Sequence, residues 1–158
     1  MKKIIFLLTA ILSIIPAMAQ SKAQPDAKRN STADNIIGNY KAVQGGEESK
    51  VKIFKASDGT YTIQVYWVKN PNDANGKPKL DEKNPDKSLR NVKNDQIVLC
   101  KGMKYDSASK TWGGAKIYDP TRGIKANIKA EFLTDGKLRI KGTVMGIGET
   151  VYWDKLAE

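Results

Sequence analysis

The stretch that decides the fold runs from Ile124 to Phe132 and reads IKANIKAEF. Apolar residues occupy every second position, and lysine, asparagine or glutamate fills the positions between them. Successive side chains of a strand point to opposite faces, so this pattern gives one dry face and one solvated face. A helix would scatter the same residues around its circumference. The stretch therefore predicts a half-buried β-strand.

The same period of two recurs along most of the chain after Ile36, with short turn segments between the alternating runs. Turns are predicted at residues 57–59, 134–136 and 146–148, where glycine follows or flanks turn-forming residues. Eight strands are predicted: Gly38–Gln44, Lys50–Ala56, Thr60–Lys69, Asp95–Tyr105, Thr111–Tyr118, Ile124–Leu133, Lys137–Met145 and Glu149–Lys155. Consecutive antiparallel strands with short turns predict an all-β, eight-stranded up-and-down barrel.

The first residues have the pattern of a secretory signal. Lys2 and Lys3 precede an apolar run over residues 4–15, and Ala17-Met18-Ala19 supplies small residues for signal peptidase. We expect a signal peptide at 1–19, cleavage between Ala19 and Gln20, and a periplasmic or secreted protein. Residues 20–35 are polar and predict a flexible leader. The barrel domain is expected at 36–158.

Two residue counts restrict the chemistry. The chain has no histidine, which excludes Ser-His-Asp and Cys-His catalysis and ordinary zinc or copper sites. Cys100 is the only cysteine and lies in an apolar run, so we expect a buried thiol and no intramolecular disulfide. We predict that the protein is not an enzyme and uses no cofactor or metal.

The charge is strongly basic, with 27 lysines and arginines against 17 acids and a formal net charge of +10. The lysines are dispersed along the chain, which is typical of the solvated exterior of a barrel. We therefore expect no nucleic-acid partner. Contact with an anionic envelope surface, or a protein-interaction role of the basic exterior, remains an alternative function.

One connection is much longer than a hairpin requires. Residues 70–94 separate the third and fourth predicted strands, and connections of that length are usually functional or mobile. Asp86 is placed to cap a helical turn that ends near Leu89. We expect this segment to lie across one mouth of the barrel.

Several short elements, taken in order and spacing, resemble the exported bacterial family of domain of unknown function 2147. The likeness spans roughly Gly38 to Lys155. The residues that carry it are Asp81, Asn84, Pro85, Asp86, Leu89, Arg90, Gly102, Gly114, Ile117, Tyr118, Asp119, Pro120, Gly123 and Trp153. The resemblance implies a lipocalin-like barrel, and by analogy a small apolar ligand held inside it.

Aromatic residues are the candidates for lining a ligand pocket, and those chosen are Tyr40, Tyr61, Trp67, Trp112 and Tyr118. Small barrels either fill their interior with side chains or hold one small ligand. Small residues on inward-pointing faces, such as Ala126, Ala130 and Gly142, would leave room. The sequence leaves an open pocket and a filled barrel as alternatives.

Asp86, Arg90 and Asp119 are predicted to anchor the long loop. An arginine fork from Arg90 onto the carboxylate of Asp119 would pin the loop to the rim of the barrel, or would act as a latch that opens for ligand. Tyr118 is expected to reach the loop through its hydroxyl. Arg122 lies inside the next turn and is expected to be exposed and uninvolved.

Three further interpretations concern the acids and one serine of the chain. The acids of the long loop do not have the spacing of a calcium loop. A carboxylate-based hydrolase would need a close pair among Asp81, Asp86, Asp119 and Glu149, and the sequence places no two together. Ser107, in Asp106-Ser107-Ala108, is a candidate O-glycosylation site, because the tripeptide is similar to one that Bacteroidetes glycosylate. The prediction is a barrel that binds a small apolar or amphipathic ligand.

Overall fold

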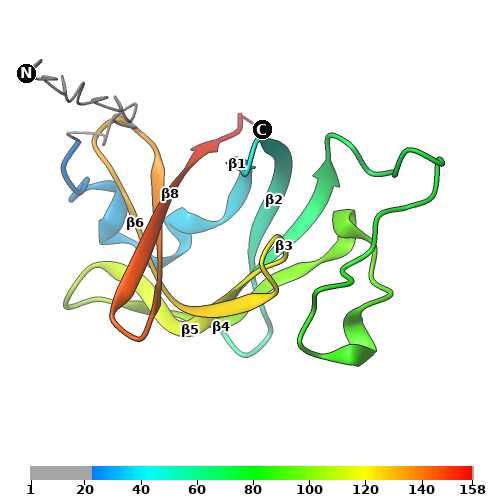
Figure 1. Cartoon of the computed structure of the whole chain (residues 1–158). Coiled ribbons are helices and arrows are strands. Elements are labelled where there is room, and N and C mark those ends of the chain that lie inside the picture. Colours follow the sequence, from blue (N-terminus) through cyan, green and yellow to red (C-terminus); the bar gives the residue numbers. More distant parts are fainter. Residues whose placement is uncertain (1–22, 158) are drawn as a thin grey trace, which may run out of the picture.

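A computed structural model of the chain describes residues 23–157 and shows a closed antiparallel barrel (Figure 1). Each strand pairs with the next in sequence, and the last pairs with the first. The strands are β1 (Gly38–Gln44), β2 (Glu47–Lys55), β3 (Tyr61–Val68), β4 (Val98–Asp106), β5 (Thr111–Asp119), β6 (Ile124–Phe132), β7 (Leu138–Val144) and β8 (Ile147–Lys155). The predicted up-and-down barrel, with its long loop between β3 and β4, is confirmed. The predicted signal peptide and its cleavage point lie outside the described residues.

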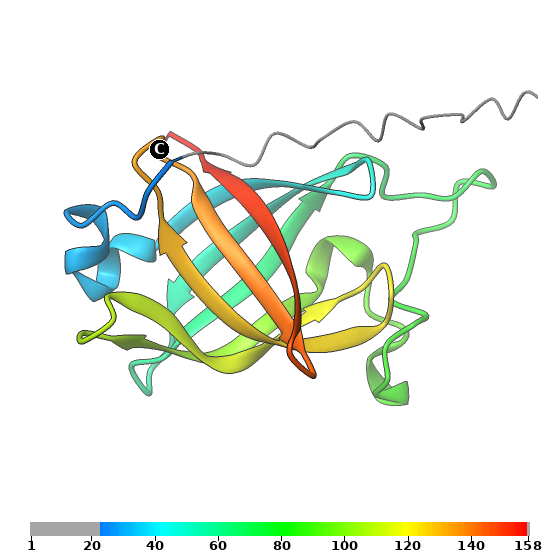
Figure 2. The ribbon, with the colours of Figure 1, turned by 60° about the vertical axis from the view of Figure 1, so that its left-hand side comes forward.

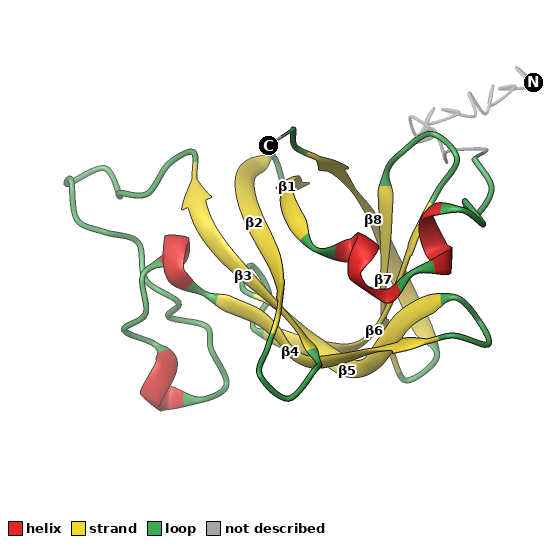
Figure 3. Ribbon diagram, turned by 180° about the vertical axis from the view of Figure 1, so that it is seen from behind, coloured by secondary structure: helices red, strands yellow, loops and turns green. Residues whose placement is uncertain are grey.

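Four short 3-10 turns accompany the strands, two at each end of the barrel (Figure 3). They are η1 (Arg29–Ser31), η2 (Ala33–Ile36), η3 (Lys87–Leu89) and η4 (Asn94–Gln96). The predicted helical turn after Asp86 is present as η3, and the Asp86 carboxylate accepts a hydrogen bond from the Ser88 backbone N–H. Within residues 23–157, no helix has the length and apolar character to cross a bilayer.

The two ends of the barrel are built differently (Figure 2). One end holds the turns β2–β3, β4–β5 and β6–β7 together with the N-terminal segment that contains η1 and η2. The other end holds the turns β1–β2, β5–β6 and β7–β8 together with the long loop. We call these the plugged end and the mouth.

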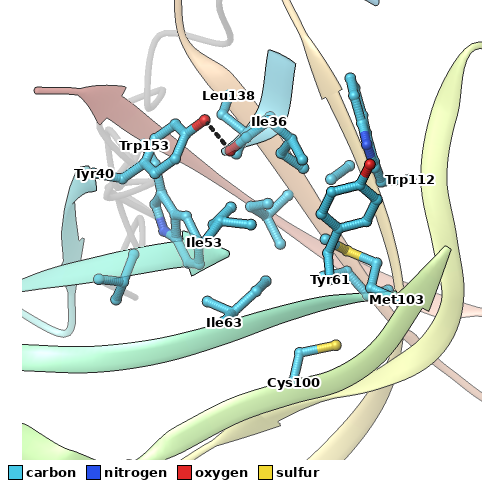
Figure 4. Packing of buried hydrophobic residues seen from close by; sticks show 14 of the residues in the cluster. Ile36, Tyr40, Ile53, Tyr61, Ile63, Cys100, Met103, Trp112, Leu138 and Trp153 are labelled. Atoms are coloured by element: carbon cyan, nitrogen blue, oxygen red, sulfur yellow. Dashed lines mark hydrogen bonds between the residues drawn. The ribbon is translucent and has the colours of Figure 1, made fainter. Parts of the chain in front are cut away.

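Large aromatic side chains fill the plugged end (Figure 4). Trp112 on β5 is fully buried and meets Phe132 on β6 edge to face, with ring centroids 5.9 Å apart. Trp112 pairs across the strands with Ala130, whose small side chain leaves space for the indole. The Tyr105 ring packs against the same indole, with the ring centroids 5.1 Å apart. This end of the barrel is therefore packed by its own residues.

The N-terminal segment closes this end, and the prediction of a flexible leader over residues 20–35 was wrong for its described part. Asn30 is 2% exposed, and its side-chain amide donates to the Phe132 carbonyl (2.9 Å) and accepts from the Phe132 N–H (2.7 Å). The Tyr105 hydroxyl donates to the Asn30 carbonyl at 2.6 Å. The Asn30 side chain thus takes the place of a neighbouring strand at the edge of β6.

Two other groups of the segment accept hydrogen bonds from side chains of the barrel. The Trp112 indole N–H donates to the Ala33 carbonyl at 2.9 Å, and the Tyr61 hydroxyl donates to the Asp34 carboxylate at 2.5 Å. Ile36 follows as a fully buried residue. The segment is polar because it supplies hydrogen bonds to the barrel, and it buries little apolar surface of its own. The domain consequently begins before Ile36.

One predicted turn was misplaced. The β7–β8 connection is the two-residue turn Met145–Gly146, whereas residues 146–148 had been predicted as the turn. Both turn residues have positive φ, 49° and 82°, which matches the twist of a tight hairpin. Ile147 therefore belongs to β8 and pairs with Val144.

We call residues 23–36, which close this end of the barrel, the plug, and they yield a stability prediction. Replacing Asn30 by alanine leaves the buried N–H of Phe132 without a partner and removes one of the two donors to its carbonyl, which keeps the Asp26 N–H, so we expect a loss of about 1–3 kcal/mol of unfolding free energy. Asn35→Ala is the matched control, because Asn35 is exposed and its side chain makes one hydrogen bond, to the Arg29 carbonyl, so the change should cost less than about 1 kcal/mol. Chemical denaturation of both variants measures the difference. Equal losses would show that the plug does not stabilise the barrel.

Candidate functional site

The half of the barrel next to the mouth contains a cavity of about 570 Å³. A volume of this size lies within the usual range for small-molecule sites. Its deeper walls are aliphatic, apart from one tryptophan. They are formed by Ala42, Val65, Val68, Ile97, Leu99, Ile117, Ala126, Ile140, Gly142, Val151 and Trp153.

The cavity exists because small residues face inward near the mouth. A Cβ atom placed on Gly142 would lie 3.2 Å from the Cβ of Ala126 and 3.9 Å from the Ile117 side chain. Ala126 and Gly142 therefore lie side by side on the inner face of β6 and β7, where bulkier side chains would fill the space. Trp153 lines the cavity and also packs on Tyr40, with the two ring centroids 6.3 Å apart. Trp153 therefore lies at the boundary between the cavity and the filled half. The barrel is filled at one end and open at the other.

The five predicted aromatic residues do not lie together. Only Tyr118 lines the cavity. Tyr40, Tyr61 and Trp112 are buried in the filled half and hydrogen-bond the plug, as Figure 4 shows for Tyr40, whose hydroxyl donates to the Ile36 carbonyl at 2.7 Å. Trp67 is 37% exposed, and the Lys50 ammonium lies 5.0 Å from its ring. The prediction that these four residues line a ligand pocket was wrong. Alternation along a strand does not tell which end of the barrel Tyr40, Tyr61 and Trp112 occupy, and a β-bulge between Val65 and Trp67 turns Trp67 to the outside.

A buried polar cluster fixes the long loop to the barrel wall. The Tyr118 hydroxyl donates to Asp81 Oδ1 at 2.6 Å, and the Asn84 amide donates to Asp81 Oδ2 at 2.7 Å. Asp81 and Asn84 are only 3% and 4% exposed. Burial and the neighbouring Asp81 carboxylate raise the pKa of Tyr118, so its hydroxyl stays protonated and continues to donate. Tyr118 reaches the loop as expected, although its partner was not foreseen.

A second contact joins the long loop to the β5–β6 turn. The Lys83 ammonium donates to the Thr121 carbonyl at 2.6 Å, which ties the loop to the β5–β6 turn. Gly123 closes this turn with φ +69°, and a Cβ on it would lie 2.4 Å from the Lys83 carbonyl oxygen. Any larger residue would push the loop away from the rim, so glycine is required at this position.

The predicted anchor pair of Arg90 and Asp119 was wrong. Arg90 Nε donates to the Asn84 carbonyl at 2.8 Å, within the loop itself. The Asp86 carboxylate accepts from the backbone and hydroxyl of Ser88, so it caps η3 and does not bridge to the barrel. Asp119 accepts from the Thr121 N–H and hydroxyl in its own turn. Asp81 and Asn84 carry the anchoring role, and their place among the residues of the family resemblance was the only sequence signal for it.

Arg122 is exposed and makes no bond to the long loop, as expected, but it has partners at the rim that the sequence did not predict. Its Nε donates to Asp119 Oδ2 at 2.6 Å, and its two terminal nitrogens donate to the two carboxylate oxygens of Glu149 on β8. Arg122 thus links the β5–β6 turn to β8 across the mouth. The two carboxylates raise the pKa of Arg122, the guanidinium lowers the pKa of Glu149, and all three side chains stay charged.

These contacts also determine the protonation state of Asp119 and Glu149, the two acids bound by Arg122. Burial raises the pKa of Asp119, but hydrogen bonds from Thr121 and Arg122 outweigh burial and bring the pKa below its usual value. Hydrolysis of a glycosidic bond needs one carboxyl group with a raised pKa as the general acid. Asp119 and Glu149 are both shifted in the opposite direction, so they do not form such a pair. Among the described residues, no cluster of three acids or cysteines is arranged to hold a metal ion.

Ser107 is exposed at the tip of the β4–β5 turn, where the Asp106 carboxylate accepts from the Ala108 N–H at 2.9 Å. The Asp-Ser sequence thus serves the turn. Glycosylation of Ser107 stays a prediction.

Comparison with known proteins agrees with this geometry. The model of a family described as uncharacterized proteins conserved in bacteria, DUF2147, matches residues 38–155. The chain belongs to this family. The match covers all eight strands and the long loop but begins after the plug, so η1 and η2 lie outside it.

A solved structure is similar in fold. Protein HP1028 from the human pathogen Helicobacter pylori, described as belonging to the lipocalin family, superposes with a TM-score of 0.60 at 22% identity. The similarity covers 78% of this chain and 84% of that protein. No curated protein matches the chain. The similarity to HP1028 supports the lipocalin-like barrel for this member of the DUF2147 family.

The loop anchor can be tested with the smallest possible change. Tyr118→Phe removes one hydroxyl and leaves Asp81 Oδ1 buried without its donor, so we expect a loss of about 1–3 kcal/mol of unfolding free energy. Tyr66→Phe removes a hydroxyl from a tyrosine that is 40% exposed and should change stability by less than about 0.5 kcal/mol. Hydrogen exchange should also speed up in residues 81–92 of the Tyr118→Phe variant. Unchanged exchange there would argue against the anchor.

The Arg122 bridge predicts a dependence on pH. The native pKa values of Asp119 and Glu149 are lowered, so their stabilising effect is complete above the unfolded values near pH 4 and is lost as pH falls through the native values. Arg122→Leu should therefore melt below the native protein at neutral pH, and the gap should close at about pH 2–3. Arg90→Leu is the control, because Arg90 bonds a carbonyl and its effect should not vary with pH. A constant gap for Arg122→Leu would contradict the bridge.

Proposed function

We propose that the protein is a periplasmic or secreted carrier that binds a small apolar or amphipathic ligand in the open half of its barrel without altering it chemically. The observation that carries the proposal is the aliphatic cavity next to the mouth. The lipocalin-like fold favours this use of a barrel interior, and the sequence of residues 1–19 supports export. Cys100, the single cysteine, is buried in the core, where burial raises its pKa to about 11 and keeps it a thiol.

The distribution of polar groups orients the ligand. The deep part of the cavity is lined by aliphatic side chains and Trp153, whereas the charged residues lie at the rim, among them Glu47, Lys79 and Arg122. The hydroxyl of Tyr118 is already used by Asp81. An apolar chain or ring would therefore enter first, and a polar group of the ligand would stay at the rim. A ligand that is charged at its buried end would have no partner there and would be excluded.

The cavity has room for one ligand of modest size. Its inner limit is set by Trp153, and the neighbouring small residues Ala126 and Gly142 leave space along one wall. Because that pair is so small, one larger side chain at position 126 would occupy much of the space. The same position is therefore the most direct place to test the proposal.

We expect the native protein to bind N-phenyl-1-naphthylamine, an apolar fluorophore, with enhanced emission. Ala126→Trp should weaken this binding by about tenfold or more, because the indole fills the apolar volume that the probe needs. Ala108→Trp makes the same substitution in an exposed turn at the plugged end and should leave the affinity unchanged. The measurement is a fluorescence titration, with thermal melts to show that both variants fold. If Ala126→Trp bound the probe as well as the native protein, the cavity would not be the site.

A further inference from the structure

The tip of the β7–β8 hairpin exposes a group of apolar side chains at the mouth. Met145 is 97% exposed, Ile147 80% and Val144 42%, and Ile124 at the start of β6 is 41% exposed. All four border the opening of the cavity. We call them the tip patch. A single exposed apolar residue needs no explanation, but a cluster at the mouth of an apolar cavity indicates a contact surface.

The turn itself argues that Met145 serves another purpose than folding. The β1–β2 hairpin at the same end uses Gly45–Gly46, with φ values of 57° and 81°, and the β7–β8 hairpin has nearly the same geometry with Met145–Gly146. This turn type favours glycine, asparagine or aspartate at its first position, because a positive φ strains other residues. Methionine is disfavoured there for two reasons: its positive φ is strained, and its apolar side chain is exposed to water. Both costs are offset if the side chain lies in an apolar environment.

Lysines flank the tip patch on the outer face of β6 and β7. The β6–β7 ladder ends at the pair Asn127–Thr143, and Lys125 and Met145 each lie two residues beyond this pair toward the mouth. The Lys141 side chain reaches toward β8, with Cε 2.8 Å from where a Cβ on Gly148 would lie, beside Ile147. Among residues 23–157 neither lysine has an acid within ion-pair distance, although the pKa of Asp86 in the long loop is lowered by its hydrogen bonds at η3 and also by the charge of Lys125.

A third lysine repeats the pattern. Lys129 lies directly across from Lys141 on the neighbouring strand. Like charges in directly opposite positions destabilise a sheet, so this arrangement is unfavourable for the isolated protein. An anionic surface beside the face would remove the repulsion.

We propose that the tip patch docks onto a bilayer that contains anionic phospholipids, with the mouth of the barrel against the membrane. Apolar side chains would enter the boundary between headgroups and acyl chains, and Lys125 and Lys141 would pair with the headgroups. A second copy of the chain is a poorer partner, because two such faces would bring their lysines together. The acids Glu47 and Glu48 lie on the β1–β2 side of the mouth, so the lysine-bearing side approaches the bilayer first. The docking itself does not depend on the proposed function. The further idea that a ligand passes between the membrane and the cavity does rest on it.

Vesicle co-sedimentation tests the docking. The protein is expressed from the full-length sequence, its N-terminus is determined by mass spectrometry, and it is mixed with vesicles of phosphatidylcholine alone or of an equimolar phosphatidylcholine–phosphatidylglycerol mixture. We expect binding to the anionic vesicles that weakens as salt is added. Met145→Asn/Ile147→Thr should reduce the partition coefficient on the order of tenfold or more. Lys125→Gln/Lys141→Gln should reduce it by about fivefold for each lysine.

The controls come from the same chain. Phe54→Thr removes an apolar residue of 37% exposure near the plugged end and should leave vesicle binding unchanged. Asparagine suits the first turn position better than methionine, so the tip variant should melt no lower than the native protein because of that change. Equal losses for the tip variant and Phe54→Thr would overturn the proposal, as would equal binding to both kinds of vesicle. A tip variant that altered only the oligomeric state, measured by analytical ultracentrifugation, would assign the patch to a second copy.

A fluorophore at the tip reports its depth directly. Met145→Cys can be labelled with an environment-sensitive dye, because the native Cys100 is only 2% exposed. We expect a blue shift with anionic vesicles for this position and none for the same dye at Ser57→Cys in the β2–β3 turn. Ala126→Trp should retain vesicle binding while it loses the apolar probe, so a failure of docking and a failure of the cavity site are distinguishable. Shifts of equal size at both labelled positions would show that the tip has no special contact.

Discussion

The structure depends on an unequal filling of one barrel. Trp112, Phe132 and Tyr40 occupy the plugged end, whereas the small residues Ala126 and Gly142 lie side by side near the mouth. A closed eight-stranded barrel has little interior to spare, so the size of a few inward side chains decides whether space remains. Here the large residues gather at one end and leave a cavity at the other. The fold is held by the first half, and the proposed function uses the second.

The two ends are closed by different physical means. At the plugged end, the side chain of Asn30 completes the hydrogen bonding at the edge of β6 and carries a polar segment into the barrel opening. At the mouth, the long loop is held to the wall through Asp81 and Tyr118, and the rim is joined by Arg122. These contacts leave the opening itself free. A rim of fixed shape lets the cavity accept a ligand without first ordering the loop, which lowers the entropic cost of binding.

The sequence predicts those features that depend on neighbouring residues and misses those that depend on distant ones. The alternation in residues 124–132 is local, and it led directly to the barrel. The hydrogen bond between Asn30 and Phe132 joins residues 102 positions apart. Nothing in a polar run such as residues 20–35 indicates such a distant partner. Asp81 and Tyr118 are 37 positions apart, and Asp119 offered an equally sound carboxylate for the loop. The cavity could be foreseen only as an alternative: Ala126 leaves space, whereas Ala130, on the same face of the same strand, lies opposite Trp112.

The central claim is that the open half of the barrel holds a small apolar or amphipathic molecule. Native mass spectrometry of protein purified from its own host, without detergent, tests it most directly. The account predicts a non-covalent adduct with the mass of one small molecule, which is released on denaturation and is absent from the Ala126→Trp variant prepared in the same way. An unmodified mass for the native protein, or an adduct that persists in Ala126→Trp, would contradict the account.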